Sequence, residues 1–165
     1  MRILTTVAAV IACLVGLAGQ ASATGSLPAP TLITAAKEHA PPGSTFRALT
    51  AVFATPTSDP DDVTEWHAAF TTPTGGIQLT YTPAGDYVST TTWAAPAANS
   101  PDDVTMTQWE ANDLRLDAGA TGDFTELTLA QPAAEPLYTF CLADTHTTVG
   151  VGTRSKQVQA DLAPC

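Results

Sequence analysis

The chain has few basic residues. Its 165 residues include six Lys and Arg against sixteen Asp and Glu, which gives a formal net charge of −10 at pH 7. Contacts to a phosphate backbone and attraction to anionic lipids both need clustered Lys and Arg, so this composition argues against both kinds of partner. We therefore expect no nucleic-acid partner. The acidity is expected to serve solubility outside the cell, with a cationic partner as the alternative.

Long apolar runs are missing from the sequence beyond its first 23 residues. Arg2 precedes an apolar run over residues 7–18, and residues 21–23 (Ala-Ser-Ala) form a small-residue cleavage site. The run is too short for a permanent membrane span, and no later segment approaches ~18 consecutive apolar residues. We expect residues 1–23 to be removed as a signal peptide. The mature chain is then expected to be secreted and extracellular, with no membrane partner after signal removal.

Cysteine is scarce, with three residues in the chain. Cys13 lies in the expected signal and leaves with it, so Cys141 and Cys165 remain as an even pair in an oxidising compartment. The sequence therefore predicts a disulfide between them. Its loop of roughly 25 residues stabilises the fold by about 3 kcal/mol on the chain-entropy model. Because the bond uses both thiols, a cysteine nucleophile or thiolate metal site is not expected.

Histidine is equally sparse. His39, His67 and His146 have no metal-site spacing, and the acidic loop at 59–62 lacks the alternating ligands of a calcium loop. No G-x-S-x-G motif is present, so a serine hydrolase is not indicated. We accordingly expect no catalytic residue, no cofactor and no metal. His39 is expected to close a short helix, and His67 to face solvent on a strand.

Turn signals divide the rest of the chain into short elements. Pro41-Pro42-Gly43 ends an expected helix at 32–40, and Ser100-Pro101 is expected to begin a second one that ends near Gly119. Period-two alternation and β-branched residues predict strands between the turns. The expected strands are 46–54, 66–70, 77–81, 87–93, 124–129, 137–142, 149–151 and 157–158.

The two halves of this pattern are similar. Phe46-Arg47-Ala48-Leu49-Thr50 parallels Phe124-Thr125-Glu126-Leu127-Thr128, each after a glycine-containing turn. We interpret this as an internal repeat of a helix-then-meander unit, with chance similarity between two meanders as the alternative. The expected organisation is a leader (24–30), a first helix-meander unit (31–93), a linker (94–99) and a second unit (100–165) with a disulfide-pinned C-terminus.

Both halves carry a sequence pattern that resembles the PepSY module, a small helix packed on a meander. The first copy shows it at Trp66-His67-Ala68-Ala69-Phe70 and Tyr87-Val88. The second shows it at Pro136-Leu137-Tyr138-Thr139-Phe140 and Val149-Gly150-Val151-Gly152-Thr153. The resemblance implies a cystatin-like α+β fold with two tandem helix-plus-antiparallel-meander units, in one sheet or two. It also implies a binding or peptidase-inhibiting role rather than catalysis.

The large aromatic residues suggest where such a module binds. Trp66, Trp93 and Trp109 are expected to anchor the core, but an exposed Trp93 beside the Ala-Pro linker would be a binding hot spot. Asp144 and His146, in an expected hairpin turn, complete the candidate binding surface. We therefore expect a non-catalytic secreted module that binds a protein or peptide, with peptidase inhibition as one form. A small secreted hydrolase with a carboxylate-rich site and a host-interaction effector are the alternatives.

Overall fold

The computed structural model describes residues 25–94, 97–160 and 162–165, so the expected signal peptide and Cys13 lie outside the described residues. Neither of its two α-helices is long and apolar enough to cross a bilayer. In chain order the elements are α1 (Ala29–His39), β1 (Thr45–Thr57), η1 (a 3-10 turn, Pro60–Asp62), β2 (Val63–Thr72), β3 (Gly75–Tyr81), β4 (Tyr87–Thr92), α2 (Gln108–Asp117), β5 (Phe124–Ala130), β6 (Leu137–Leu142), β7 (Thr148–Gly152) and β8 (Val158–Gln159).

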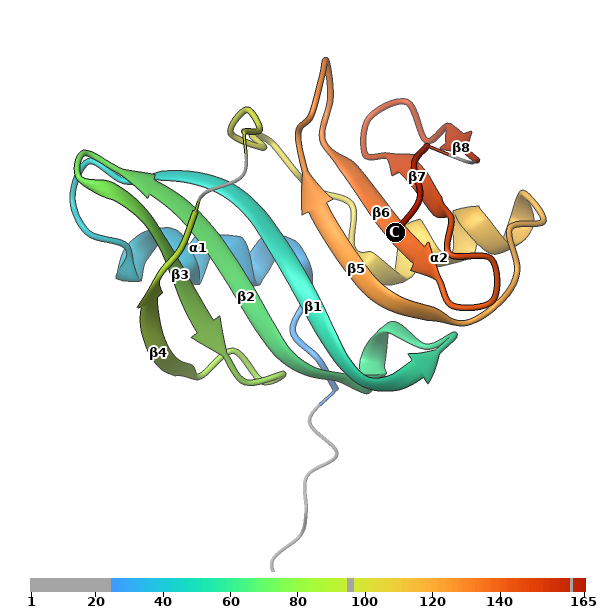
Figure 1. Ribbon diagram of the computed structural model, residues 1–165, viewed down its shortest axis with the longest axis horizontal. Helices are drawn as coiled ribbons and strands as arrows, with labels where there is room; N and C mark the ends of the chain where they lie inside the picture. Colours follow the sequence, from blue (N-terminus) through green and yellow to red (C-terminus); the bar gives the residue numbers. More distant parts are fainter. Residues whose placement is uncertain (1–24, 95–96, 161) are drawn as a thin grey trace, which may run out of the picture.

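The eight strands form one antiparallel sheet in the order β4-β3-β2-β1-β5-β6-β7-β8 (Figure 1). Each half of the chain adds its strands outward from the centre, where β1 pairs with β5. In that central pairing Ala48 lies opposite Ala130, and Thr50 lies opposite Thr128. The central joint therefore brings together residues that are far apart in the sequence.

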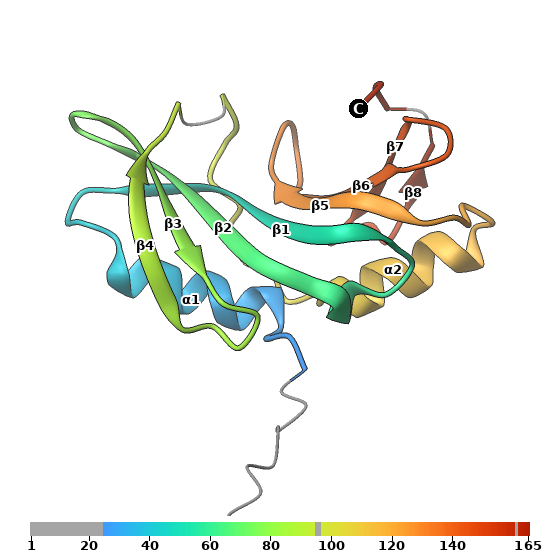
Figure 2. The same ribbon diagram turned by 60° about the horizontal axis from the view of Figure 1, so that its bottom comes forward.

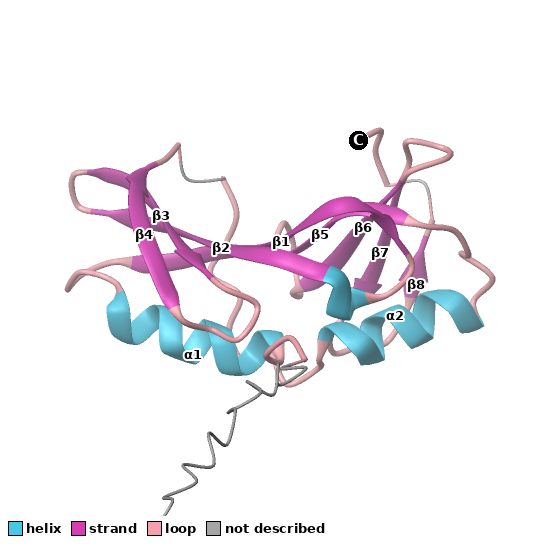
Figure 3. Ribbon diagram, turned by 90° about the horizontal axis from the view of Figure 1, so that it is seen from below, coloured by secondary structure: helices cyan, strands magenta, loops and turns pink. Residues whose placement is uncertain are grey.

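Both helices cover the same face of the sheet. α1 and α2 lie one after the other below it, and among the described residues no helix lies on the opposite face (Figure 2, Figure 3). The apolar residues of α1 recur with helical spacing, so Ala29, Leu32, Ile33 and Ala36 are buried against the sheet. The largest fully buried apolar side chains of the core are Trp66, Tyr81, Tyr138, Phe46, Phe70, Phe124 and Phe140.

Polar contacts join the two helices near their N-termini. The Gln108 side chain is fully buried; its Oε1 accepts the Ala29 N–H at 2.8 Å and its Nε2 donates to the Leu27 carbonyl at 2.9 Å. Tyr138 donates its hydroxyl to the Met106 carbonyl at 2.8 Å. The Gln108 contacts cross between the two halves, and the buried apolar residues of both halves form one continuous core.

The expected α+β fold of two tandem helix-plus-meander units is wrong for this chain. The described residues form mainly one eight-stranded sheet, accompanied by two short helices. The physical reason lies at the centre, where β1 and β5 hydrogen-bond to each other instead of presenting unpaired edges. Two separate units would each leave that inner edge exposed.

The second helix also begins later than expected. The Ser100 hydroxyl donates to Asp102 Oδ1 instead of capping a helix, and Asp103 has a φ of 56°, which is not helical. Neither residue therefore starts a helix. α2 instead begins after Thr107, whose side chain accepts the Glu110 N–H while Glu110 reaches back to the Thr107 N–H. This capping box satisfies two backbone donors at once, whereas a lone capping serine satisfies one.

One charged side chain lies inside the core. Arg115 is fully buried, with its guanidinium carbon 5.1 Å from the ring centroids of both Phe124 and Phe140. Its Nε donates to Asn112 Oδ1 at 2.9 Å and its Nη1 to the Ala120 carbonyl at 2.7 Å, while Nη2 has no partner. Within the described residues no carboxylate forms an ion pair with it.

Candidate functional site

The helix-free face of the sheet carries a hollow of about 400 Å³. In a strand, alternate side chains point to opposite faces, so the residues next to the core residues in each strand point to the helix-free face. On β1 the lining residues are Ala48, Thr50 and Val52, which alternate with buried Leu49 and Ala51. The full lining consists of Ala48, Thr50, Val52, His67, Ala69, Gln78, Trp93, Ala94, Glu126, Thr128 and Ala130.

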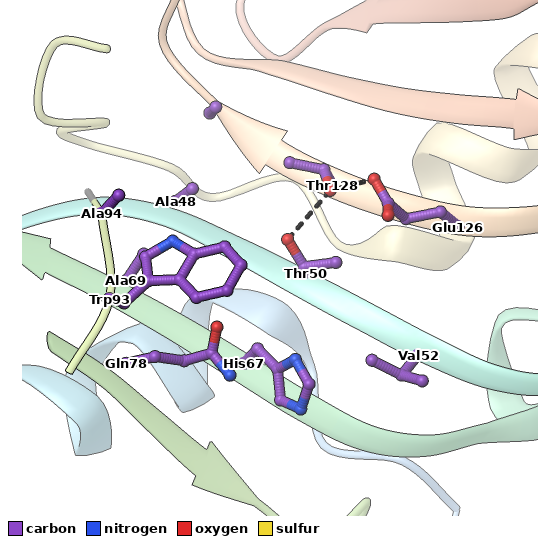
Figure 4. Close-up of a pocket in the computed structure, with 11 residues that line it drawn as sticks. Ala48, Thr50, Val52, His67, Ala69, Gln78, Trp93, Ala94, Glu126 and Thr128 are labelled. Atoms are coloured by element: carbon purple, nitrogen blue, oxygen red, sulfur yellow. Dashed lines mark hydrogen bonds between the residues drawn. The ribbon is translucent and has the colours of Figure 1, made fainter. Parts of the chain in front are cut away.

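One end of the hollow is apolar. Ala48 faces Ala69 on β2 and Ala130 on β5, which makes a floor of small side chains. Trp93 follows β4 and lies over this floor (Figure 4). Its backbone N–H donates to the Gly76 carbonyl at 3.0 Å, while the residue as a whole is 51% exposed. Of the two expectations for Trp93, the structure therefore supports the exposed residue, not the core anchor.

The middle of the hollow is polar. The hydroxyls of Thr50 and Thr128 are hydrogen-bonded across the β1–β5 joint, with 3.0 Å between the oxygens. His67 lies opposite Thr50 on β2, and Gln78 on β3, which pairs with Ala69, also lines the hollow (Figure 4). His67 is half-buried and Trp66 fully buried, so the expected alternation of these two residues is confirmed. These groups can donate or accept hydrogen bonds toward a ligand.

Glu126 lines the far end of the hollow, and Glu65 lies outside the lining, across Val52 from it. Val52 lies opposite Glu65 on β2 and opposite Glu126 on β5, so the two carboxylates flank it on the same face. Glu65 Oε2 is 3.1 Å from His67 Nε2, and Thr128 donates to Glu126 Oε1 at 3.1 Å. Neither carboxylate forms an ion pair with Lys or Arg in the described part of the chain.

Arg47 lies beyond the apolar end of the hollow. Its Nε donates to Thr71 Oγ1 at 2.7 Å, and its Nη1 donates to the Ala98 carbonyl at 3.0 Å. The guanidinium therefore ties the segment after Trp93 to the sheet. It also makes the two ends of the face opposite in charge, with Arg47 at one and the glutamates at the other.

The second half of the same face is covered by the C-terminal tail. The predicted disulfide is present, with Cys141 and Cys165 Cα atoms 5.8 Å apart. The tail also exchanges hydrogen bonds with Thr148, and the Leu162 side chain lies so close to Gly150 that a Cβ there would be 2.5 Å from it. Glycine at position 150 thus permits the close approach of the tail, which fills the space over β7.

The expected turn residues do not join the hollow. Asp144 and His146 lie in the exposed turn between β6 and β7, and His146 has φ of 52°. The sheet order places β3, β2, β1 and β5 between that turn and Trp93 on the β4 edge. The candidate binding surface expected from the sequence is therefore split, and Trp93 alone of these three residues borders the hollow.

The described residues contain no cluster of metal ligands, and two of the three histidines contact residues other than serine. No group of three His, Cys, Asp or Glu side chains there could hold a metal ion. His39 Nδ1 contacts the Tyr81 hydroxyl at 3.3 Å, and His67 contacts Glu65, so neither is hydrogen-bonded to a serine. The groups on the helix-free face can contact a ligand through the Trp93 ring, the threonine hydroxyls and the glutamate carboxylates.

The sequence did not reveal Glu65 and Glu126 as a pair. Alternation along β2 and β5 places each of them on the face opposite the core, and that signal was available. Glu65 and Glu126 come together because both strands pair with β1 in a register that places each glutamate opposite Val52. No local sequence pattern encodes such a long-range register.

Comparisons with known proteins show the fold. Neither the family models nor the curated proteins compared with this chain match it. A solved structure of a candidate lipoprotein from Clostridium difficile 630 is similar, with a TM-score of 0.62 and 13% identity, over 82% of this chain and 91% of that chain. Identity at this level supports similarity of fold alone. The resemblance to the PepSY module stays a prediction, as does the internal repeat.

Proposed function

We propose that this chain is an exported, non-catalytic module that binds protein or peptide segments on the helix-free face of its sheet, away from the part that the C-terminal tail covers. The observation that carries the proposal is Trp93, half-exposed over a hollow on the face without helices. Tryptophan is enriched among residues that dominate binding energy, because it buries a large rigid area at little entropic cost.

The shape of the hollow favours an extended segment as ligand. Its volume of about 400 Å³ is within the range of ligand sites, roughly 300–1,000 Å³. It lies along strands on the surface of the sheet, so a bound chain can run across it and remain continuous on both sides. Fixed polar groups beside an apolar floor can orient such a segment.

Export is part of the proposal. The apolar N-terminal segment, the disulfide and the similarity of fold to a candidate lipoprotein all support a location outside the cytoplasm. Fractionation of cells that express the full chain tests this. We expect a shortened protein in the culture medium; the protein retained at full length inside the cell would contradict export.

Selection of displayed random peptides tests the binding role directly. Peptides retained by the wild-type protein are screened against Trp93→Ala, and we expect most of them to lose binding. Leu116→Ala is the matched control, since Leu116 is an exposed apolar residue on α2, which covers the opposite face. Peptides that bind both variants equally, or no selected peptides at all, would contradict the assignment of this face.

Peptidase inhibition is the form of binding implied by the resemblance to the PepSY module, and it has its own test. The wild-type protein and Trp93→Ala are added to a panel of secreted peptidases, and residual activity is measured. Inhibition that depends on Trp93 would support this form. Cleavage of the chain without inhibition would make it a substrate.

A further inference from the structure

We infer that the segment bound on this face carries a basic side chain, which the Glu65 and Glu126 carboxylates receive, four residues from an apolar side chain packed on Trp93. The inference rests on the proposed function and names the chemistry of its ligand. The ligand class is an extended, cationic and amphipathic stretch of polypeptide.

The spacing follows from the strand that runs along the floor. Ala48 lies beneath the apolar end near Trp93, and Val52 lies between the two carboxylates at the other end. Four residues of extended chain span about 13 Å. In an extended ligand, side chains i and i+4 point to the same face and are separated by the same distance. An apolar and a basic side chain with this spacing therefore reach both ends together.

The charge follows from the register of three strands. Val52 pairs with Glu65 on one side and with Glu126 on the other, so the Cα atoms of the two glutamates are about 10 Å apart, on the two strands that flank β1. Both side chains are exposed. An ammonium or guanidinium group placed over Val52 lies between two negative charges, and the excess of acidic over basic residues in the chain attracts it at longer range.

The remaining groups decide which end of the face receives the basic side chain and which kind of side chain fits between the two ends. Arg47 borders the apolar end, so a basic side chain there would meet a like charge, whereas at the acidic end it meets Glu65 and Glu126. Between the ends, the Thr50 and Thr128 hydroxyls suit a small polar side chain at i+2. The expected pattern is apolar-x-polar-x-basic, in either chain direction.

Titration of the protein with capped pentapeptides tests this pattern. The probes are Leu-Ser-Thr-Ser-Lys and its reverse, each compared with versions in which Lys is replaced by Gln or Glu, or is moved by one position so that it points away from the sheet. Binding is followed by NMR at the Trp93 indole N–H, which reports weak affinities. Trp93→Ala identifies this resonance.

Two double variants separate local from overall charge. Glu65→Gln/Glu126→Gln removes both carboxylates from the face. Asp113→Asn/Asp117→Asn changes the net charge by the same amount on α2, beneath the other face of the sheet. For the wild-type protein in low salt we expect the Lys peptides to bind about five- to tenfold tighter than the Gln peptides, as two exposed ion pairs allow. The preference should survive in the aspartate variant, vanish in the glutamate variant and shrink near 1 M salt.

Each other result has a distinct meaning. If Lys and Gln peptides shift the Trp93 resonance with equal affinity, the inferred charge is wrong and the peptide-binding role stands. If the preference persists without the two glutamates, or if the shifted Lys binds equally well, the assigned acidic site is wrong. If no peptide perturbs Trp93, neither this inference nor the proposed function survives.

Discussion

Replacement of Arg115 by methionine tests how a buried charge without a carboxylate partner is stabilised in this core. The substitution keeps an unbranched apolar stem of similar length and removes the guanidinium. Burial lowers the pKa of the Arg115 guanidinium, and the nearby Asp123 carboxylate partly offsets this. The group nevertheless stays charged at every accessible pH. The variant therefore compares a charged core group with a neutral one.

Two opposing contributions set the magnitude. The hydrogen bonds to Asn112 and Ala120 come from a charged donor and contribute about 1.5–3 kcal/mol each, and the two aromatic contacts about 0.5–1 kcal/mol each. Removing the charge relieves several kcal/mol of desolvation, including that of the unpartnered Nη2. We expect a net loss of about 3 kcal/mol, because methionine leaves both acceptors without a donor.

Urea unfolding followed by circular dichroism measures this loss directly. At about 3 °C per kcal/mol for a domain of this size, Tm should fall by about 10 °C. Arg154→Met is the control, since Arg154 is exposed, and we expect it to change the free energy of unfolding by less than about 1 kcal/mol. The loss should not vary between pH 5 and pH 9, since the guanidinium keeps its charge there.

An unchanged or raised stability for Arg115→Met would refute this reasoning. It would mean that desolvation outweighs the contacts to the Phe124 and Phe140 rings and the two acceptors. Arg115→Lys then separates charge from geometry. An ammonium cannot donate in two fixed directions while lying flat between two rings, so we expect Arg115→Lys to lose stability as well.

Three further outcomes follow from the fold. Reduction of the Cys141–Cys165 disulfide should lower the free energy of unfolding by about 3 kcal/mol and speed amide exchange in the tail; unchanged exchange would contradict its pinning role. The β3–β4 register directs the Thr91 N–H toward β3 and the Thr90 N–H outward. Thr91→Pro should therefore lower the free energy of unfolding in urea by about 2 kcal/mol or more, whereas Thr90→Pro should be tolerated. Equal losses for the two variants would refute the register. Burial raises the pKa of Tyr81 to about 12. The stability that this shift contributes is present below about pH 10 and should be lost as pH rises from about 10 to about 12. Tyr81→Phe should remove that part of the alkaline transition seen by circular dichroism.

Local patterns predicted several elements correctly. Pro41 and Pro42 cannot continue a helix, and α1 ends at His39 as expected. Alternation on β2 placed Trp66 in the core and His67 on the other face. Such signals succeed because they depend on neighbours within a few residues.

The start of α2 shows where local signals compete. Ser100-Pro101 and Thr107-Gln108-Trp109-Glu110 both match a helix N-terminus, and the sequence-based prediction rested on Ser100-Pro101 alone. The second begins the helix, because its reciprocal cap also places Gln108 and Ala111 against the core. The choice between two adequate caps was made by tertiary packing.

The sequence by itself determined which residues alternate in and out of each strand, where the two cysteines pair, and that the chain carries far more acid than base. Tertiary structure decided that β1 and β5 join the halves into one sheet, and that Glu65, Glu126 and Trp93 share its uncovered face. The physical reason is that hydrogen-bonded strand pairing depends on partners far along the chain. A periodic pattern gives each strand its two faces, but the register with a distant strand decides which residues lie side by side.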